Sequence, residues 1–155
     1  RRVIALATSS DGSTFSAPKI VLRQGALYSN ASGFDGFSTP AAMVLGGRVH
    51  LFYDVGCFDP TAERKWTQVA IHHASSPDGE TGWVEDAKPI LTRKSLPWTA
   101  MEIRSPAPLL EGNRLLLYFA GNDYPANFIP DVRVSSRTTR FGIGCMSIDI
   151  SSWKR

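Results

Sequence analysis

The 155-residue sequence lacks the long apolar segments and dense cysteine patterns that mark membrane and metal-rich proteins. It has no run of 18 apolar residues, so no segment is expected to span a membrane. No window keeps an apolar period of 3.6 residues, so little helix is expected. The only two cysteines, Cys57 and Cys145, have no metal-ligand spacing, and we interpret them as unpaired small apolar side chains, with one bridge between them as the alternative.

Charge is also not concentrated in one place. The chain has 17 basic and 14 acidic residues, for a net charge of +3. Arg133, Arg137 and Arg140 form the only local cluster, which we interpret as part of a solvated loop. Nucleic-acid binding needs a focused basic stripe, so no nucleic-acid partner is expected. The sequence starts at Arg1 almost directly in a predicted strand, which suggests a processed chain or a piece of a longer one.

One segment is present twice. FSTPAAMVLGGRVHLFY at residues 37–53 returns as IRSPAPLLEGNRLLLYF at residues 103–119, an offset of 66 residues. Each copy has the pattern of two strands joined by a two-residue type I′ turn, at Gly46-Gly47 and at Gly112-Asn113. A unit of this size cannot bury its own apolar face, so the copies are expected to stack.

A second motif alternates with the first. IALATSSDGSTF at residues 4–15 resembles IHHASSPDGETGW at residues 71–83, and FGIGCMSIDISSW at residues 141–153 is a third copy without the glycine. Each is a strand followed by serine, aspartate and an aromatic residue. In the first two copies Asp-Gly supplies the positive φ that a tight turn needs.

Together the two motifs predict an all-β protein built from β-propeller blades of four antiparallel strands. We expect one partial five-bladed propeller domain over residues 1–155. It would contain half a blade (1–37), a full blade (38–92) and most of another (103–155). That is about two and a half blades, whereas a closed ring needs roughly four to eight. An open arc leaves two sheet faces uncovered, so we expect a homodimer, or a companion chain, to complete the ring.

The combined pattern is a Ser/Thr-Pro pair, an apolar strand, a Gly-x turn and an aromatic-ended strand, and then Asp-Gly and tryptophan. It resembles the five-bladed propeller glycosidases of glycoside hydrolase families 43 and 32. The resemblance implies a carbohydrate partner, a secreted or periplasmic location, and a histidine near the ring axis that can accompany a metal ion such as calcium. No other cofactor and no set of protein metal ligands is expected.

The family positions for the catalytic acids differ in this chain. In these families one blade has Asp directly before the strand's proline, and another has Glu two residues before it. Here the residues directly before the two prolines are Thr39 and Ser105, and the residues two before them are Ser38 and Arg104. None of the four is a carboxylate. Two functions therefore stay open. One is a glycoside hydrolase-like propeller that acts on a glycan by carboxylate acid/base chemistry, and the other is a non-catalytic carbohydrate-binding or scaffold module.

Glycoside hydrolysis uses two carboxyl groups across a sugar ring, one as general acid and one as base or nucleophile. Our candidate for the acid is Glu102, and for the base Asp35 or Asp54. Glu102 and Arg104 share one face of a continuous strand, so an ion pair between them is the alternative. Asp54 is predicted to end the strand LFYD, where it could instead cap a turn.

Four further residues are candidates for substrate binding. Trp98, in a loop just before Glu102, could be a stacking platform for a sugar or a packed aromatic. His72 lies mid-strand, and a packed core histidine is its alternative. Asp123, the last residue of FAGND, comes after the strand of the next unit in the same setting as Asp54, and it could likewise cap a turn instead. Arg104 completes the set.

Overall fold

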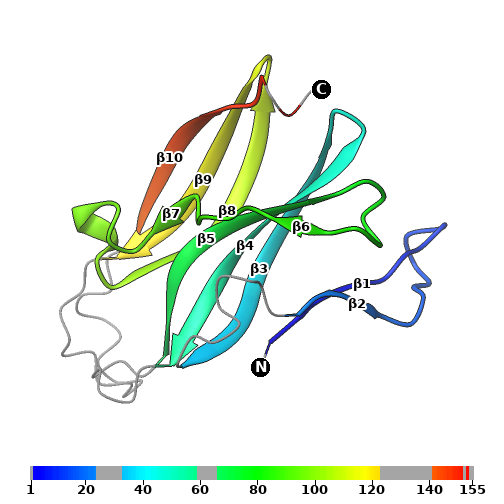
Figure 1. The fold of residues 1–155 in the computed structure, drawn as a ribbon, viewed down its shortest axis with the longest axis horizontal. Helices are drawn as coiled ribbons and strands as arrows, with labels where there is room; N and C mark the ends of the chain where they lie inside the picture. The colour runs from blue at the N-terminus through cyan, green and yellow to red at the C-terminus, as the bar shows by residue number, and fades with distance from the viewer. Residues whose placement is uncertain (1, 24–32, 59–65, 123–140, 152, 154–155) are drawn as a thin grey trace.

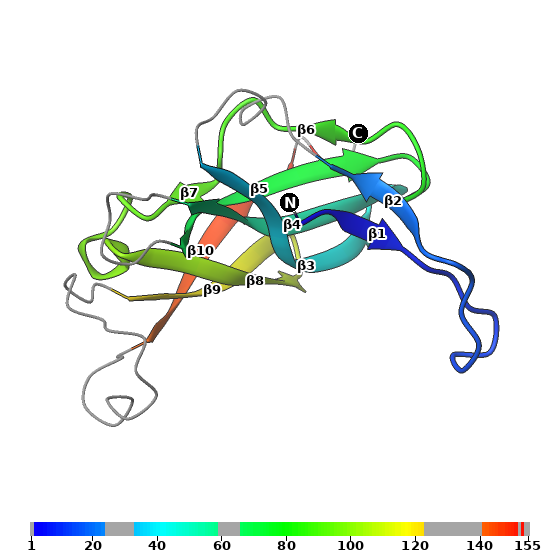
Figure 2. The same cartoon turned by 90° about the horizontal axis from the view of Figure 1, so that it is seen from below.

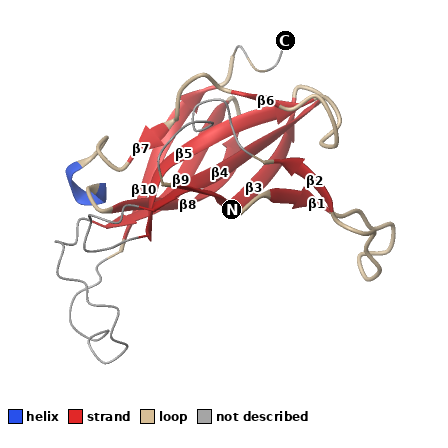
Figure 3. Cartoon of the chain, turned by 60° about the horizontal axis from the view of Figure 1, so that its bottom comes forward, coloured by secondary structure: helices blue, strands red, loops and turns tan. Residues whose placement is uncertain are grey.

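The computed structural model describes residues 2–23, 33–58, 66–122, 141–151 and 153, and it is all-β (Figures 1 and 3). Within these ranges the one helical element is a short 3-10 turn at Pro97–Thr99, and no helix is long and apolar enough to cross a membrane. The strands are β1 (Ile4–Leu6), β2 (Lys19–Leu22), β3 (Phe34–Leu45), β4 (Arg48–Phe58), β5 (Trp66–Ser76), β6 (Val84–Glu85), β7 (Leu91–Thr92), β8 (Glu102–Glu111), β9 (Arg114–Asn122) and β10 (Gly142–Asp149).

The strands form three antiparallel sheets (Figures 1 and 2). Sheet 1 is the pair β1-β2. Sheet 2 has the order β3-β4-β5-β6, with β7 also paired to β5, and sheet 3 has the order β10-β9-β8. β3 begins at Phe34, which lies inside the segment 1–37 that we assigned to the first half blade. The strand that we expected almost directly after Arg1 is short, and covers Ile4–Leu6.

The two copies of the hairpin repeat have the same pairing register. Ala41 pairs with Phe52 in sheet 2, and Ala107 pairs with Tyr118 in sheet 3. Their turns differ, however. Gly46 and Gly47 both have positive φ, as a type I′ turn requires, whereas in the second turn only Gly112 does. Our prediction of a type I′ turn at Gly112-Asn113 is therefore wrong, because Asn113 keeps a negative φ.

The repeated Asp-Gly turns are built alike. In each, one carboxylate oxygen, that of Asp11 or Asp78, accepts the backbone N–H groups two and three residues further on, at 2.7–2.8 Å. These bonds lower the pKa of both carboxyl groups below the usual value. Gly12 and Gly79 follow with φ of 72° and 80°. The second motif is therefore one local structure used twice.

Sheet 2 is covered on both faces by its neighbours in the chain. Tyr53 and Leu51 pack with Ile4 and Leu22 of sheet 1. Successive residues of a strand point to opposite faces, so Phe52 belongs to the other side. That side packs on Ile103, Leu115, Leu117 and Phe119 of sheet 3. The three sheets thus stack face to face in chain order, as propeller blades do.

A buried histidine pair lies in the contact between sheets 2 and 3. His50 Nδ1 lies 2.9 Å from His73 Nε2, and His73 Nδ1 lies 3.0 Å from an oxygen of Asp86. Trp153 stacks on both imidazoles, with ring centroids 4.9 and 4.5 Å away. His72 points to the opposite face, toward sheet 1, as the alternation of the strand predicted.

Both hairpins bend at the same place. Thr39 has φ of 43° and Ser105 has φ of 56°, and they are the only non-glycine residues with positive φ in the described part of the chain. Each directly precedes the proline of its repeat, and each lies at a shift of register. This conformation costs about 1–2 kcal/mol for a residue with a Cβ atom, so something must hold the two bends in place.

Candidate functional site

The carboxylate of Asp54 holds the two bends together. Its oxygens accept hydrogen bonds from Ser38 Oγ, from Thr39 Oγ1 and, at 3.1 Å, from the backbone N–H of Ser105. Asp54 lies on β4, the two hydroxyls lie on β3, and the amide lies on β8. We call these residues, Asp54, Ser38, Thr39 and Ser105, the Asp54 cluster. It joins the innermost strands of sheets 2 and 3.

The position of Asp54 corrects one expectation. β4 does not end at Asp54 but continues to Phe58, because residues 55–58 go on pairing with β5. Asp54 is therefore inside a strand and caps no turn. Its side chain is fully buried, and three donors compensate for the loss of water around its charge.

The outer part of the Asp54 cluster is polar and accessible. Ser38 and Thr39 are half-buried and Ser105 is exposed. The neighbouring side chain of Arg104 is 34% exposed. The surface beside the two bends therefore offers hydroxyl groups, and the Asp54 carboxylate orients those of Ser38 and Thr39. The guanidinium of Arg104 is held by Glu102.

Glu102, our candidate acid, is also fully buried. Its carboxylate accepts a hydrogen bond from Arg104 Nη1 at 3.1 Å and another from Asn122 Nδ2 at 3.3 Å. The ion pair with Arg104 that we gave as the alternative is thus present. Sequence reasoning missed Asn122. The repeat offset could have found it, because Glu102 and Asn122 occupy the places of Gly36 and Gly56 in the preceding copy.

Asp54 and Glu102 approach β8 from different sides. Alternation along the strands places Glu102 and Asn122 on the face of sheet 3 that carries Tyr118. Asp54 lies with Phe52 on the face of sheet 2 that packs against the opposite face of sheet 3. The structure therefore does not bring the two carboxylates into one described cavity.

Asp35, the other candidate base, lies in a third place. Its carboxylate forms an ion pair with Arg2 at 2.6 Å, and the two side chains are 21% and 43% exposed. Arg2 runs past Gly36 and Gly56, where an added Cβ atom would lie only 2.1 Å from Arg2 atoms. Asp35 thus helps to fasten the start of the chain to sheet 2.

The candidates for substrate binding are separated as well. Trp98 stacks on Phe119 with ring centroids 5.6 Å apart, so that aromatic face is covered. His72 is buried and stacks on Tyr53, at 5.9 Å. Burial lowers the pKa of His72 from 6.5 to about 4. Asp123 lies outside the described residues.

The metal ion that the resemblance implies finds no ligand set in the described part of the chain. No group of three or more His, Cys, Asp and Glu side chains gathers there. His72 is packed against an aromatic ring instead. The described residues therefore provide no cluster of three such side chains to hold a metal ion.

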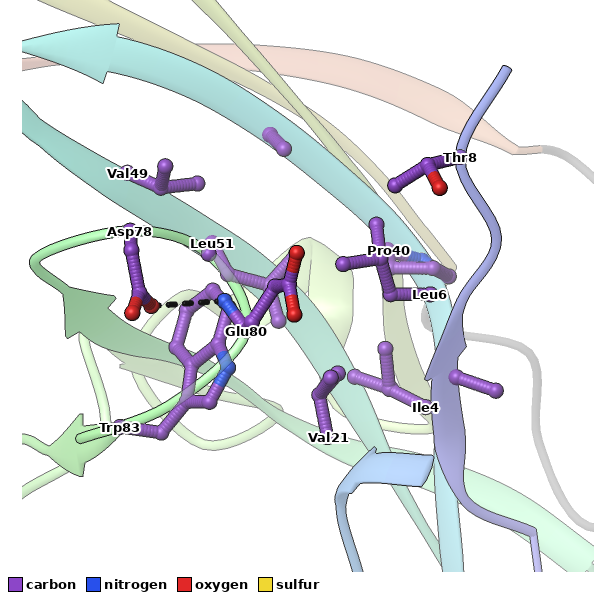
Figure 4. A pocket seen from close by; sticks show the side chains of 13 residues that line it. Ile4, Leu6, Thr8, Val21, Pro40, Val49, Leu51, Asp78, Glu80 and Trp83 are labelled. Atoms are coloured by element: carbon purple, nitrogen blue, oxygen red, sulfur yellow. Dashed lines mark hydrogen bonds between the residues drawn. The ribbon is translucent and has the colours of Figure 1, made fainter. Parts of the chain in front are cut away.

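A cavity of about 390 Å³ lies between sheets 1 and 2 (Figure 4). Ile4, Val21 and Leu51 give it a mostly apolar lining, and the indole of Trp83 stands at one side. Trp83 Nε1 is buried there without a hydrogen-bond partner among the described residues. None of the predicted catalytic or binding residues lines this cavity, so it is separate from the Asp54 cluster.

Solved structures provide the comparison for this arrangement. The chain is similar to CoXyl43, a family 43 β-xylosidase/α-arabinofuranosidase from a compost microbial metagenome solved with xylotriose, at a TM-score of 0.55 and 17% identity. It is also similar to RS223-β-xylosidase, at a TM-score of 0.54 and 15% identity. The chain has a family 43-like propeller fold. Neither a protein-family model nor a curated protein matches the sequence.

The similarity covers most of this chain but only part of the others. It includes 73% and 76% of this chain, and 31% and 33% of the two xylosidase chains. The resemblance to propeller glycosidases and the all-β partial propeller expected from the repeats are therefore confirmed. The chain spans about a third of the length of those proteins, so this likeness establishes a glycosidase-like fold alone.

Proposed function

We propose that this chain recognises a glycan at the Asp54 cluster as a non-catalytic member of the glycosidase-like propellers. The observation that carries the proposal is the use of the Asp54 carboxylate. It accepts three hydrogen bonds from within the chain and is fully buried. A group held in this way orients its neighbours and does not touch a substrate.

The groups that Asp54 orients suit a sugar. Sugar hydroxyls both donate and accept hydrogen bonds. The oxygens of Ser38 and Thr39 can accept from a sugar while their own protons bond to Asp54, and the Ser105 hydroxyl can donate and accept. Arg104, which directly precedes Ser105 on β8 and pairs with Glu102, adds a planar set of donors on the other face of that strand. A site of fixed polar groups strongly favours ligands that match its hydrogen bonds. The similar structure with xylotriose supports a xylo-oligosaccharide as the first probe.

Isothermal titration of the full chain with xylotriose tests this proposal. We expect saturable binding that weakens at least tenfold in Arg104→Gln, about 1.4 kcal/mol. The matched control is Arg114→Gln, because Arg114 is exposed at the far end of the same sheet. Absence of binding to a panel of neutral and acidic oligosaccharides, or equal binding by both variants, would contradict it.

Hydrolysis is the second candidate, because Asp54 lies on β4 and Glu102 lies on β8, two strands that are in contact. In that function Glu102 would protonate the leaving oxygen, and Asp54 would activate water or attack the anomeric carbon. Glu102 would first have to leave Arg104 and Asn122. A panel of aryl glycosides with Glu102→Gln as control separates the two functions. Wild-type turnover that disappears in the variant supports hydrolysis, and no turnover in either supports binding alone.

A further inference from the structure

Sheet 3 has an exposed apolar face whose counterpart in sheet 2 is fully covered. The strands of sheets 2 and 3 pair in the same register, so positions in the two sheets can be matched. Phe52 and Ile71 of sheet 2 correspond to Tyr118 and Ile143 of sheet 3. Phe52 and Ile71 are 0% exposed, whereas Tyr118 is 37% and Ile143 is 83% exposed. Cys145, in the place of His73, is exposed too.

Sheet 1 shows the complementary situation at the other end of the chain. In the second motif, Ala5 of β1 and Val3, just before β1, correspond to His72 and Ala70 of β5. Ala70 and His72 are each 1% exposed, on the face of sheet 2 that packs against sheet 1. Val3 is 38% exposed, and Ala5 is exposed beside its cross-strand partner Ile20, which is 40% exposed.

The molecule therefore makes one kind of sheet-to-sheet contact twice, between sheets 1 and 2 and between sheets 2 and 3. Among the residues that the structure describes, each end of the chain has one half of that contact without its counterpart. The exposed face of sheet 3 corresponds to the face of sheet 2 that packs on the following sheet. The exposed face of sheet 1 corresponds to the face of sheet 2 that packs on the preceding sheet. Exposed apolar faces of this type mark interaction sites.

We propose that a second copy of this chain covers both faces. Sheet 1 of each copy would pack on sheet 3 of the other, with Val3, Ala5 and Ile20 against Tyr118, Ile143 and Leu109. Two head-to-tail contacts then close a ring with twofold symmetry around a central channel. The inner strands that carry the Asp54 cluster face this channel, so the second copy completes its surroundings. The inference concerns assembly and holds whether or not a glycan binds.

Sedimentation velocity of the full chain gives the first test. The chain has a mass of 17.0 kDa, so a twofold assembly has twice that mass. We expect the dimer at micromolar concentration and a shift toward the monomer in Ile143→Glu and in Ile20→Glu. The control is Val84→Glu, which changes an equally accessible residue, 64% exposed, on the rim strand β6. It should leave the dimer intact.

Mixing the two disruptive variants tests the head-to-tail arrangement. A dimer of either variant with itself has one altered residue in each of its two contacts. An equal mixture can form a pair with one fully native contact, so it should regain a dimer that neither variant forms alone. Circular dichroism of each variant confirms that it is folded, and Tyr118→Lys replaces Ile143→Glu if that chain is not.

Three results would overturn the proposal. The first is a wild-type chain that stays monomeric up to high micromolar concentration, which would leave these faces to a different partner. The second is a dimer that none of the face variants weakens. The third is a pair of disruptive variants that fail to recover a dimer when mixed, which would indicate that like faces meet.

Discussion

At the scale of single residues, Asp54 is the side chain on which the inner part of the structure most depends. It joins three strands through three hydrogen bonds and has no contact with water. We expect Asp54→Asn to lower the free energy of unfolding by about 2–4 kcal/mol, because bonds to a buried charge are strong and the amide adds an unmatched donor. Urea denaturation followed by tryptophan fluorescence measures it.

The matched control is Asp35→Asn, which removes another carboxylate near the inner strands. Asp35 is partly exposed and paired with the more exposed Arg2, so its loss should cost less than about 1 kcal/mol. Equal costs for the two substitutions would show that the Asp54 cluster does not hold the bends.

Ser105 is strained by its backbone conformation. Its φ is 56°, and the contact it makes with Asp54 uses only its backbone N–H. Ser105→Gly should therefore stabilise the chain by up to about 1 kcal/mol, and Ser105→Val should destabilise it by at least that much. Thr39→Gly should gain less, because it also removes a hydroxyl bound to Asp54. Thermal unfolding would rank the three, and a stabilising Ser105→Val would refute the assignment of strain.

At the scale of elements, strand β10 packs closely against Trp98 and Phe119 because it has glycines at the contact. A Cβ atom on Gly144 would lie 2.5 Å from Phe119 Cζ and 2.8 Å from Trp98 Cζ2, inside the contact that holds both rings. We expect Gly144→Ala to cost about 1–3 kcal/mol, the usual effect of overpacking. Ser147→Ala, on the exposed face of the same strand, should change stability by less than about 0.5 kcal/mol. Similar costs for both would mean that the aromatic rings move aside freely.

The elements also show what the sequence could and could not predict. The hairpins were predictable because Gly46-Gly47 and the alternating apolar residues around it depend only on neighbours in the chain. The bends were not. Thr39 and Ser105 have residue types that favour ordinary strand geometry, and what stabilises their positive φ is a carboxylate 15 residues from one and 51 from the other.

The site was harder to predict for the same reason. Residue type and spacing correctly paired Glu102 with Arg104, because both lie on one face of one strand. Spacing could not reveal that Asp54, Glu102 and Asp35 have three separate sets of partners, since those partners come from neighbouring strands, from Ser105 of another sheet and from Arg2.

At the scale of the whole molecule, buried histidines make the fold sensitive to acid. The pKa of His72 falls from 6.5 to about 4 through burial, and burial next to His73 lowers the pKa of His50 as well. Between pH 6.5 and 4 the unfolded chain binds protons that the folded chain does not. The stabilisation is therefore complete above pH 6.5 and is lost as the pH falls toward 4, with His72 contributing roughly 3 kcal/mol.

Urea unfolding at pH 7 and at pH 4.5 measures this loss, and His72→Gln isolates the part that belongs to His72. The variant should lose less stability on acidification than the wild type. Its free energy of unfolding should still depend on pH, because His50 and the carboxyl groups still titrate. If His72→Gln loses as much stability on acidification as the wild type, the pKa of His72 is the same in the folded and unfolded chains.

The shared bend before Pro40 and Pro106 also has a consequence for the origin of this molecule. The two hairpins have diverged at many positions, yet both keep a strained hydroxyl residue where glycine would be easier. A rare geometry is more simply inherited once than acquired twice. Duplication of one hairpin that already had this bend explains both copies by a single event, and one carboxylate now serves the two bends, since Asp54 of the first copy has Ala120 as its counterpart in the second.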